Sequence, residues 1–274
     1  MYQARRQCQH ERKKKVNQMK KVKTVLLGLI IPVLVVIFWW YATNYGNTPE
    51  SILPKISTVG KTIGAMWTAG SLQEDLIISL QRVVEGYLIS AVLGIVLGTI
   101  MGMSETVRKI FQPTVTTIRQ IPIMAWIPLL ILWCGIGEAS KIVIIVIASF
   151  FPIMVNTLSG ISQTPLEYVE VAKLYKISKW KTFIRVYLPH ALPHIQTGLK
   201  LGLGVSWMAV VAAELIASTS GIGYRMSYAR TLMQSDVVII CMIVIGIIGI
   251  LMDKLLTIIF TALTPWERKR RERG

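Results

Sequence analysis

Residues 24–41 form an unbroken apolar block, TVLLGLIIPVLVVIFWWY, which contains no Asp, Glu, Lys, Arg or His. As a helix rising about 1.5 Å per residue, this block nearly crosses a hydrocarbon layer of about 30 Å. Trp39, Trp40 and Tyr41 at its end are typical of a membrane–water interface. The block is longer than the apolar core of a signal peptide and no small-residue cleavage site follows it, so it predicts a retained membrane anchor.

Apolar residues make up 53% of the chain, and they occur in long runs rather than at the spacing of amphipathic helices. Runs of this kind predict membrane-spanning helices. Five further spans follow the first block, at residues 83–103, 107–134, 142–158, 195–217 and 237–263, and prolines interrupt the run at 107–134. The predicted fold class is therefore all-α, an integral membrane protein with six transmembrane helices.

Lysine and arginine are unevenly distributed between the segments that join these spans. They are concentrated in residues 1–23, in residues 264–274 and in the segment before the fifth span. Since basic residues stay on the cytoplasmic side, this pattern places both termini in the cytoplasm. Topology and anionic lipid headgroups then explain the formal net charge of +16, and nucleic acid is not an expected partner.

The chain divides into a basic cytoplasmic arm (1–23), the first transmembrane helix (24–45), an extracytoplasmic segment (46–75), a membrane-spanning core (76–263) and a basic cytoplasmic tail (264–274). Glycines and prolines in the extracytoplasmic segment predict surface loops. The core contains glycines that recur every four residues, which let helix backbones approach closely, either within the chain or between subunits. These glycines are Gly94, Gly98 and Gly102, and then Gly198 and Gly202.

Two patterns resemble ligand sites but lack required features. Residues 60–62 (GKT) match the end of a phosphate-binding loop, but its first glycine would fall at Lys55, so no ATP site is predicted. His190 and His194 have the spacing of zinc ligands, but a proline precedes each of them and disfavours a regular helix there. The three cysteines are scattered, so neither a metal centre nor a disulfide framework is expected.

Charged side chains inside membrane spans are costly, at least about 2.5 kcal/mol at the centre, and so are usually functional or paired. Glu214 follows Trp207 by two helical turns, which places both on roughly one helix face. Either these residues border a translocation pathway, or Glu214 hydrogen-bonds a neighbouring span. Arg82 is expected to flank the start of a helix. Arg119 either attracts an anion or flanks the membrane.

The cytoplasmic segment before the fifth span predicts two short helices. Residues 164–167 (TPLE) form a capping box with proline at the first helical position, which predicts a helix over about 165–175. A second helix is expected to begin at Ser178 and to end before Pro189. The apolar face of the first helix has no span beside it, so a partner is expected to cover Leu166, Val169 and Leu174.

This segment resembles the permease subunits of type I ATP-binding-cassette importers, whose cytoplasmic motif is E-A-A-x3-G-x9-I-x-L-P. The chain has Glu170, Val171 and Ala172, then Lys176 at the glycine position, and ends with residues 186–189 (VYLP). The spacing is kept throughout. Glycine at this position would end the helix in a left-handed turn, where a residue with a side chain costs about 1 kcal/mol.

A second stretch is similar to the nitrate, sulfonate and taurine branch of this family, which typically has P-x-x-A-W-x-P-L-x-x-x-W-F-G-I-G-E-x-S-K. Residues 122–141 (PIMAWIPLLILWCGIGEASK) follow this pattern, with Cys134 where phenylalanine is common. The chain also has AAELIA around Glu214, GIG at 221–223 and LTPW at 263–266. The likeness covers most of the chain after residue 50.

The resemblance implies a homodimer of permeases in the inner membrane of a prokaryote, with two cytoplasmic ATPase subunits and an extracytoplasmic solute-binding protein. The ATPase would hold ATP and Mg²⁺, so the chain is expected to be a transport subunit with no cofactor and no enzymatic activity of its own. The expected solute is a sulfonate, taurine, nitrate or similar small anion, and a neutral vitamin precursor is the alternative. An ion channel or an intramembrane enzyme is disfavoured, because no filter or paired catalytic groups are apparent.

The resemblance also assigns roles to individual residues. The helix at 165–175 would be the coupling helix that docks on the ATPase, through Leu166, Val169, Glu170, Ala172, Leu174, Tyr175 and Lys176. The translocation pathway is expected to be bordered by Trp126, Trp133, Trp207 and Glu214.

Overall fold

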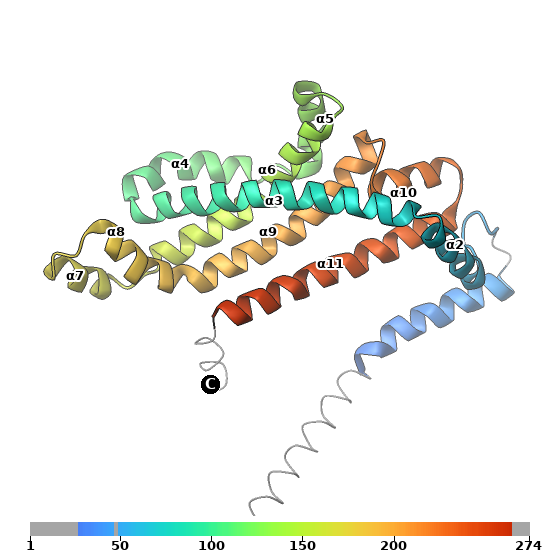
Figure 1. The fold of residues 1–274 in the computed structure, drawn as a ribbon, viewed down its shortest axis with the longest axis horizontal. Helices are drawn as coiled ribbons and strands as arrows, with labels where there is room; N and C mark the ends of the chain where they lie inside the picture. Colours follow the sequence, from blue (N-terminus) through green and yellow to red (C-terminus); the bar gives the residue numbers. More distant parts are fainter. Residues whose placement is uncertain (1–26, 47–48, 265–274) are drawn as a thin grey trace, which may run out of the picture. The chain divides into compact units, whose positions relative to one another are not determined.

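The computed structural model describes residues 27–46 and 49–264, and its regular elements over those ranges are all helical (Figure 1). Two compact units divide the chain, residues 1–61 and 62–274. The predicted basic arm and almost all of the basic tail lie outside the described residues.

The first unit contains an apolar helix, Leu27–Tyr45, long enough to cross a membrane. This agrees with the predicted first span. Trp39 near its end donates a hydrogen bond from Nε1 to the carbonyl of Pro54, 3.0 Å away. The predicted surface loop is present at residues 49–55, but the prediction is wrong around Gly60, because helix α2 (Ile56–Thr68) begins soon after Pro54. Gly60 and Gly64 lie inside α2, with open space where a Cβ would point.

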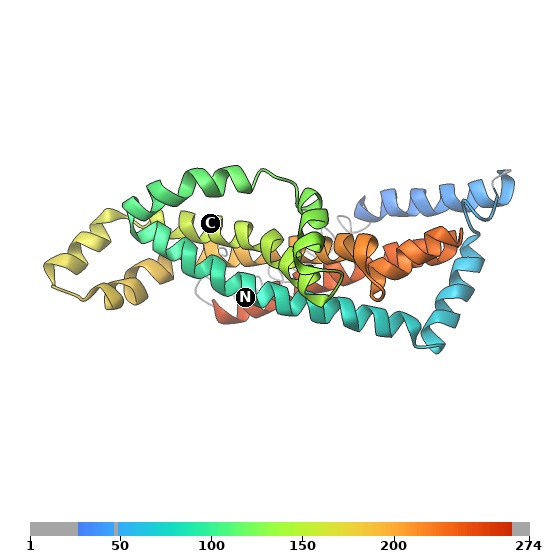
Figure 2. The ribbon, with the colours of Figure 1, turned by 90° about the horizontal axis from the view of Figure 1, so that it is seen from above.

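Three long helices of the second unit lie side by side: α3 (Ser71–Met103), α6 (Glu138–Ser162) and α9 (Leu188–Ala217) (Figures 1 and 2). Glycines of α3 face α6. A Cβ at Gly98 would lie 2.6 Å from the carbonyl oxygen of Met154, and one at Gly102 would lie 2.6 Å from Ile161. Gly198 and Gly202 of α9 also face α6. The glycine spacing therefore serves packing within the chain, one of the two possibilities left open by the sequence.

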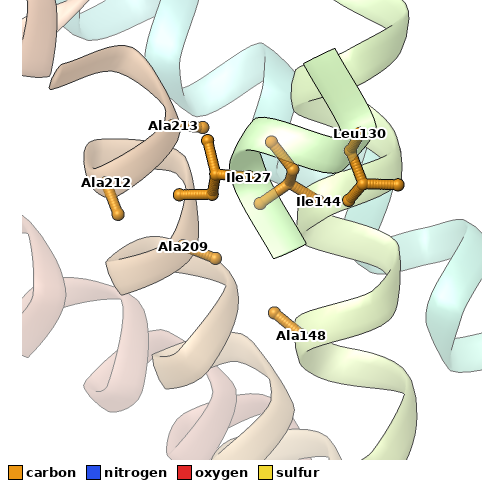
Figure 3. Close-up of a cluster of buried hydrophobic side chains, with 7 residues drawn as sticks. All are labelled: Ile127, Leu130, Ile144, Ala148, Ala209, Ala212 and Ala213. Carbon is orange, nitrogen blue, oxygen red and sulfur yellow. The ribbon is translucent and has the colours of Figure 1, made fainter. Parts of the chain in front are cut away.

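The predicted third span is a broken pair, α4 (Glu105–Ile118) and α5 (Ile123–Cys134), bent by 95°. Pro122 is the last residue of the break, and its missing N–H and fixed φ explain why the helix does not continue there. Helix α5 packs through Ile127 and Leu130 onto small and branched residues of α6 and α9 (Figure 3). These are Ile144, Ala148, Ala209, Ala212 and Ala213.

Helices α10 (Ile222–Thr231) and α11 (Ser235–Leu263) complete the second unit. Trp207 of α9 donates from Nε1 to the carbonyl of Ile245 on α11, at 2.9 Å. Within the described residues five helices are long and apolar enough to span a membrane, and the bent α4–α5 pair makes six when it is counted as one span. The predicted number of spans is thus confirmed.

The segment predicted to be cytoplasmic forms α7 (Leu166–Leu174) and α8 (Lys179–Thr182), as predicted, but the second helix does not end before Pro189. It continues through a π turn, Phe183–Tyr187, directly into α9. Leu188 N–H bonds to Phe183 O, one residue further back than in an α-helix. This shift of the hydrogen-bond ladder lets the helix pass Pro189, which has no N–H to contribute.

The contact between α3 and α6 gives a first prediction. Gly98→Ala should lower the melting temperature of the detergent-purified protein by several degrees, because the new Cβ overlaps the Met154 carbonyl oxygen and forces two helix backbones apart. Gly246→Ala is the matched control, since a Cβ at Gly246 in α11 meets nothing within 4 Å. Unfolding is followed by circular dichroism. Equal melting temperatures for the two variants would show that the close approach of α3 and α6 is not needed.

Candidate functional site

A buried polar cluster joins four elements at the ends of α3, α6, α9 and α10. Arg82 of α3 lies at its centre and is only 3% exposed. Its guanidinium donates to Glu214 (2.7 Å) and by two parallel bonds to Glu138 (2.6 and 2.7 Å). The remaining donors reach the carbonyl and hydroxyl oxygens of Ser220, both at 2.9 Å. All five N–H donors of the arginine are therefore used.

Glu214 is 1% exposed and accepts hydrogen bonds from several elements. Ser79 Oγ of α3 lies 2.9 Å from both carboxylate oxygens, and Gly223 N–H donates at 3.0 Å. Of the two possibilities considered for Glu214, its contacts are those of a residue that hydrogen-bonds a neighbouring span. The prediction that Arg82 merely flanks a helix start is wrong, because Arg82 is the buried counter-ion of Glu214.

The start of α10 closes this cluster through its backbone. Successive N–H groups of Gly221, Ile222 and Gly223 donate at 3.0 Å to Asp75 Oδ1, Ser79 Oγ and Glu214 Oε2. Gly221 has φ +103°, and a Cβ there would lie 2.4 Å from Glu214 Oε1, so both conformation and space require glycine. Arg225 pairs with Asp75. We call Asp75, Ser79, Arg82, Glu138, Glu214 and Arg225 the polar junction.

Sequence reasoning missed most of the polar junction. A signal was present, because Asp75, Ser79 and Arg82 follow the i, i+4, i+7 spacing of one stripe along a helix. Their partners Glu138 and Glu214 lie far away in the sequence and could not be paired with that stripe without the fold.

A cavity of about 520 Å³ lies between the α4–α5 break and the middle of α6 and α9. We call it the central cavity. Trp126 of α5 lines it, together with Arg119, Phe151 and Asn156. The other predicted pathway residues do not: Trp133 is 66% exposed, and Trp207 and Glu214 are buried in helix contacts. The role of these four residues in translocation stays a prediction.

Helix α7 presents two kinds of side chain. Leu166, Leu174 and Tyr175 are 75 to 80% exposed, and Glu170 is also exposed. The predicted apolar face is therefore split, because Val169 is buried by the chain itself, and so is Ala172.

The predicted capping box does not form. Pro165 takes the N-cap position with ψ 131°, and no side chain caps the first turn. The hydroxyl of Thr164 is buried and has no hydrogen-bond partner in the described residues. Proline at the N-cap displaces threonine from the position at which its oxygen could accept from the N–H groups of the first turn.

The end of α7 has the left-handed turn that the family motif normally builds with glycine. Lys176 has φ +50°. Ile177 N–H donates to Ala172 O at 3.0 Å, and Lys176 N–H donates to Lys173 O at 2.9 Å. These two bonds define a Schellman motif. The turn is thus retained with lysine in place of glycine.

Histidines 190 and 194 lie on the regular part of α9, so the prediction that the adjacent prolines break the helix there is wrong. Both histidines line a second cavity, of about 800 Å³, beside Tyr168 and Ala172 of α7. In the described part of the chain, no group of three or more His, Cys, Asp or Glu residues is placed to hold a metal ion.

Comparison with known proteins places these features in context. Residues 90–269 match the family described as binding-protein-dependent transport system inner membrane component. The taurine transport system permease protein of Escherichia coli is 36% identical over 249 residues, which cover 89% of this chain and 90% of the relative. A protein of Bacillus subtilis named as an aliphatic sulfonates transport permease is 33% identical over 239 residues, 87% of each chain.

The same fold occurs in a solved structure described as an amino acid ABC transporter with histidines. The TM-score is 0.61 at 15% sequence identity, over 73% of this chain and 97% of that chain. Because the identity is low, this likeness concerns the fold alone.

The polar junction gives a second prediction. Arg82→Met should destabilise the protein by about 3–5 kcal/mol, because the buried Glu214 loses its counter-ion. Glu214→Gln should cost less, since Arg82 keeps Glu138 and the amide can still accept a hydrogen bond. Glu105→Gln is the control: its ion pair with Lys109 is exposed and worth about 0–1 kcal/mol. Stability is measured by thermal unfolding. If Arg82→Met lowers the stability no more than Glu105→Gln does, the central role of Arg82 is contradicted.

The end of α7 gives a third prediction. Lys176→Gly should stabilise the turn by about 1 kcal/mol, because glycine adopts positive φ without strain. Tyr175→Gly is the matched control, since Tyr175 has φ −79° and gains nothing from glycine. Hydrogen exchange of the α7 amides is the measurement. Slower exchange is expected only for Lys176→Gly, and faster exchange in both variants would refute the assignment.

Proposed function

The chain belongs to the binding-protein-dependent transport system inner membrane components, and from this premise we propose that it moves a small solute with an oxyanion group, such as taurine or another sulfonate, across the membrane. The protein is the permease subunit of an ABC importer and a transport component rather than an enzyme. Its relatives are named for taurine and for aliphatic sulfonates, which supports an anionic solute over a neutral vitamin precursor. The central cavity beside the middle of α6 and α9 is the observation that carries the proposal.

The importer would be completed by other subunits. The family's description names binding-protein-dependent transport, and we propose a solute-binding protein on the outer face, two ATPase subunits on the inner face and a second copy of this permease. The chain is an inner-membrane protein with several spans. The excess of lysine and arginine in residues 1–23 and 264–274 supports a cytoplasmic position for both termini.

Helix α7 is proposed to contact the ATPase. Its exposed apolar side chains, Leu166, Leu174 and Tyr175, would be covered by a groove on that partner, and Glu170 would supply a charge at its edge. Val169 and Ala172 were predicted to contact the ATPase, but both side chains are buried within the chain. Their proposed role is to pack α7 against the rest of the permease. Lys176 contributes the turn that ends the helix.

A movement of α7 would pass through the turn at Lys176 and then along continuous helix from α8 into α9. Helix α8 leads through the π turn into α9 without an intervening loop. At its far end α9 is held by Glu214 in the polar junction. ATP, bound with Mg²⁺ on the partner ATPase, would supply the energy by closing the ATPase pair. The protein's own residues would transmit that displacement along α9 to the walls of the central cavity.

The contact gives a fourth prediction. Glu170→Arg and Leu174→Asp should each reduce the amount of ATPase that co-purifies with the permease, because the first reverses a charge and the second places a carboxylate in an apolar contact. Membrane yield should stay normal, since both side chains are exposed. ATPase activity stimulated by loaded binding protein should fall in parallel.

Two further variants separate coupling from folding. Glu50→Arg reverses an exposed charge outside α7 and should leave the complex unchanged. Ala172→Trp enlarges a 3% exposed side chain at the edge of the second cavity, so it should disturb the packing of α7 on its own chain and lower the yield of folded permease. Normal assembly and normal stimulated hydrolysis in both α7 surface variants would mean that α7 is not the coupling helix.

A further inference from the structure

The central cavity is an open hollow beside the middle of α6 and α9, and the residues of the α4–α5 break that line it are exposed. On α6 its lining runs from Ile147, nine residues after Glu138, to Asn156, six residues before Ser162. At about 1.5 Å per residue, the cavity starts roughly 9 Å or more from either end of that helix. On α9 it is lined by Leu201 and Val205, roughly 18 Å from both helix ends. The cavity therefore lies at the depth of the membrane interior.

Arg119 reaches this cavity from the break between α4 and α5. Residues 119–122 are not helical, although both flanking helices are. Irregular backbone at membrane depth is tolerated only where it is buried in protein or lines a cavity, since lipid offers no hydrogen bonds. Residues 119–122 all line the central cavity. The position of Arg119 does not fit the alternative of an arginine that flanks the membrane.

The charge of Arg119 is not neutralised by the protein. Arg82 and Arg225 both pair with carboxylates, but Arg119 forms no ion pair within the ranges that the structure describes. No carboxylate is present among the described residues that line the central cavity. An unpaired cation at membrane depth costs at least about 2.5 kcal/mol, so its presence calls for a compensating role.

The remaining lining provides a polar donor and apolar walls. Asn156 donates one N–H of Nδ2 to Pro152 O at 2.8 Å, which leaves the second N–H available. Gln120 adds another amide, whereas Trp126, Phe151 and Val155 are apolar. A strong cation, amide donors and apolar walls together suit a small molecule with a compact oxyanion group and a short carbon chain.

We propose that Arg119, assisted by Asn156, forms the anion-selective site of the central cavity and binds the sulfonate or equivalent oxyanion of the solute during its passage. The site rests on the proposed import of a small anion and adds the residues that select for it. Arg119 would bind the charged oxygens directly, and Trp126 with Phe151 would contact the carbon chain.

Transport by the complete importer in proteoliposomes tests the proposal. ATP-driven uptake of labelled taurine, ethanesulfonate and nitrate is measured with the cognate binding protein. Arg119→Gln should lower uptake of the accepted anion about tenfold or more, because a charge-assisted contact is lost. Arg119→Lys should retain most of the uptake. Arg108→Gln is the matched control, since it removes a cation of α4 that does not line the cavity.

The outcomes separate the two levels of inference. If the wild-type importer takes up none of the three anions but does take up a neutral solute, the proposed function fails. If it takes up an anion and Arg119→Gln does so at the same rate, the proposed function stands and the Arg119 site is overturned. An equal loss in Arg108→Gln would also overturn the site, because it would indicate a general effect of charge.

A second measurement does not depend on the folding of the Arg119 variants. The fluorescence of Trp126 is obtained as the difference between the wild-type complex and Trp126→Phe, and it is quenched with iodide. Because Trp126 shares the cavity with Arg119, iodide should quench it, and the solute that the importer accepts in the uptake test should relieve that quenching several-fold. Quenching of Trp126 by acrylamide serves as the reference. Acrylamide is neutral, so the solute should reduce its quenching less than it reduces quenching by iodide.

Trp133 provides the matched control for this measurement. It lies on the same helix but does not line the cavity. The solute that the importer accepts in the uptake test should leave iodide quenching of Trp133 unchanged, as measured with Trp133→Phe. Equal effects of that solute on Trp126 and Trp133, or no effect on either, would overturn the proposed site.

Discussion

The buried ion pair between Arg82 and Glu214 is the interaction on which the arrangement of the second unit depends. Both side chains are removed from solvent, and each alone would carry a large desolvation penalty. The structure offsets that penalty by satisfying every donor of the guanidinium and by adding the hydroxyl of Ser79 and the N–H of Gly223 to the carboxylate. Because these partners come from α3, α6, α9 and the start of α10, the pair can be satisfied only when all four elements are in register.

The two ends of this helix bundle differ in how they are held. At the polar junction, polar contacts join α3 to α6, α9 and α10. At the opposite end, α7 is attached through the turn at Lys176 and through the burial of two small side chains, Val169 and Ala172. Between the two ends, α3, α6 and α9 approach through glycines. The hydroxyls of Ser149 and Ser90 lie 2.6 Å apart and join α6 to α3, and the Tyr87 hydroxyl donates to the Leu199 carbonyl at 3.0 Å and joins α3 to α9. The three long helices are therefore held by polar contacts along their length, whereas α7 depends on one turn and two buried side chains.

The sequence allowed the fold class to be predicted because hydropathy and glycine spacing are local properties. Long apolar runs placed the spans, and the four-residue glycine repeat identified the helix faces that pack. The prediction failed where the conformation of the adjacent backbone decides the outcome. Pro189 is a helix breaker in isolation, but a π turn ahead of it carries the helix onward. Thr164 is a good capping residue in isolation, but Pro165 occupies the N-cap and the hydroxyl is buried.

The arginines show most clearly what sequence alone cannot decide. Arg82 and Arg119 both lie within or between apolar runs, and nothing in their neighbouring residues separates them. The fold brings Glu138 and Glu214 to Arg82, and in doing so it uses all five of its donors. It brings only amide and apolar side chains to Arg119, and it leaves a cavity beside them. The first arginine therefore has no capacity left for a solute, while the second retains its full charge. In a bundle of apolar helices, the arrangement of carboxylates is what distinguishes a structural cation from one that is free to bind an anion.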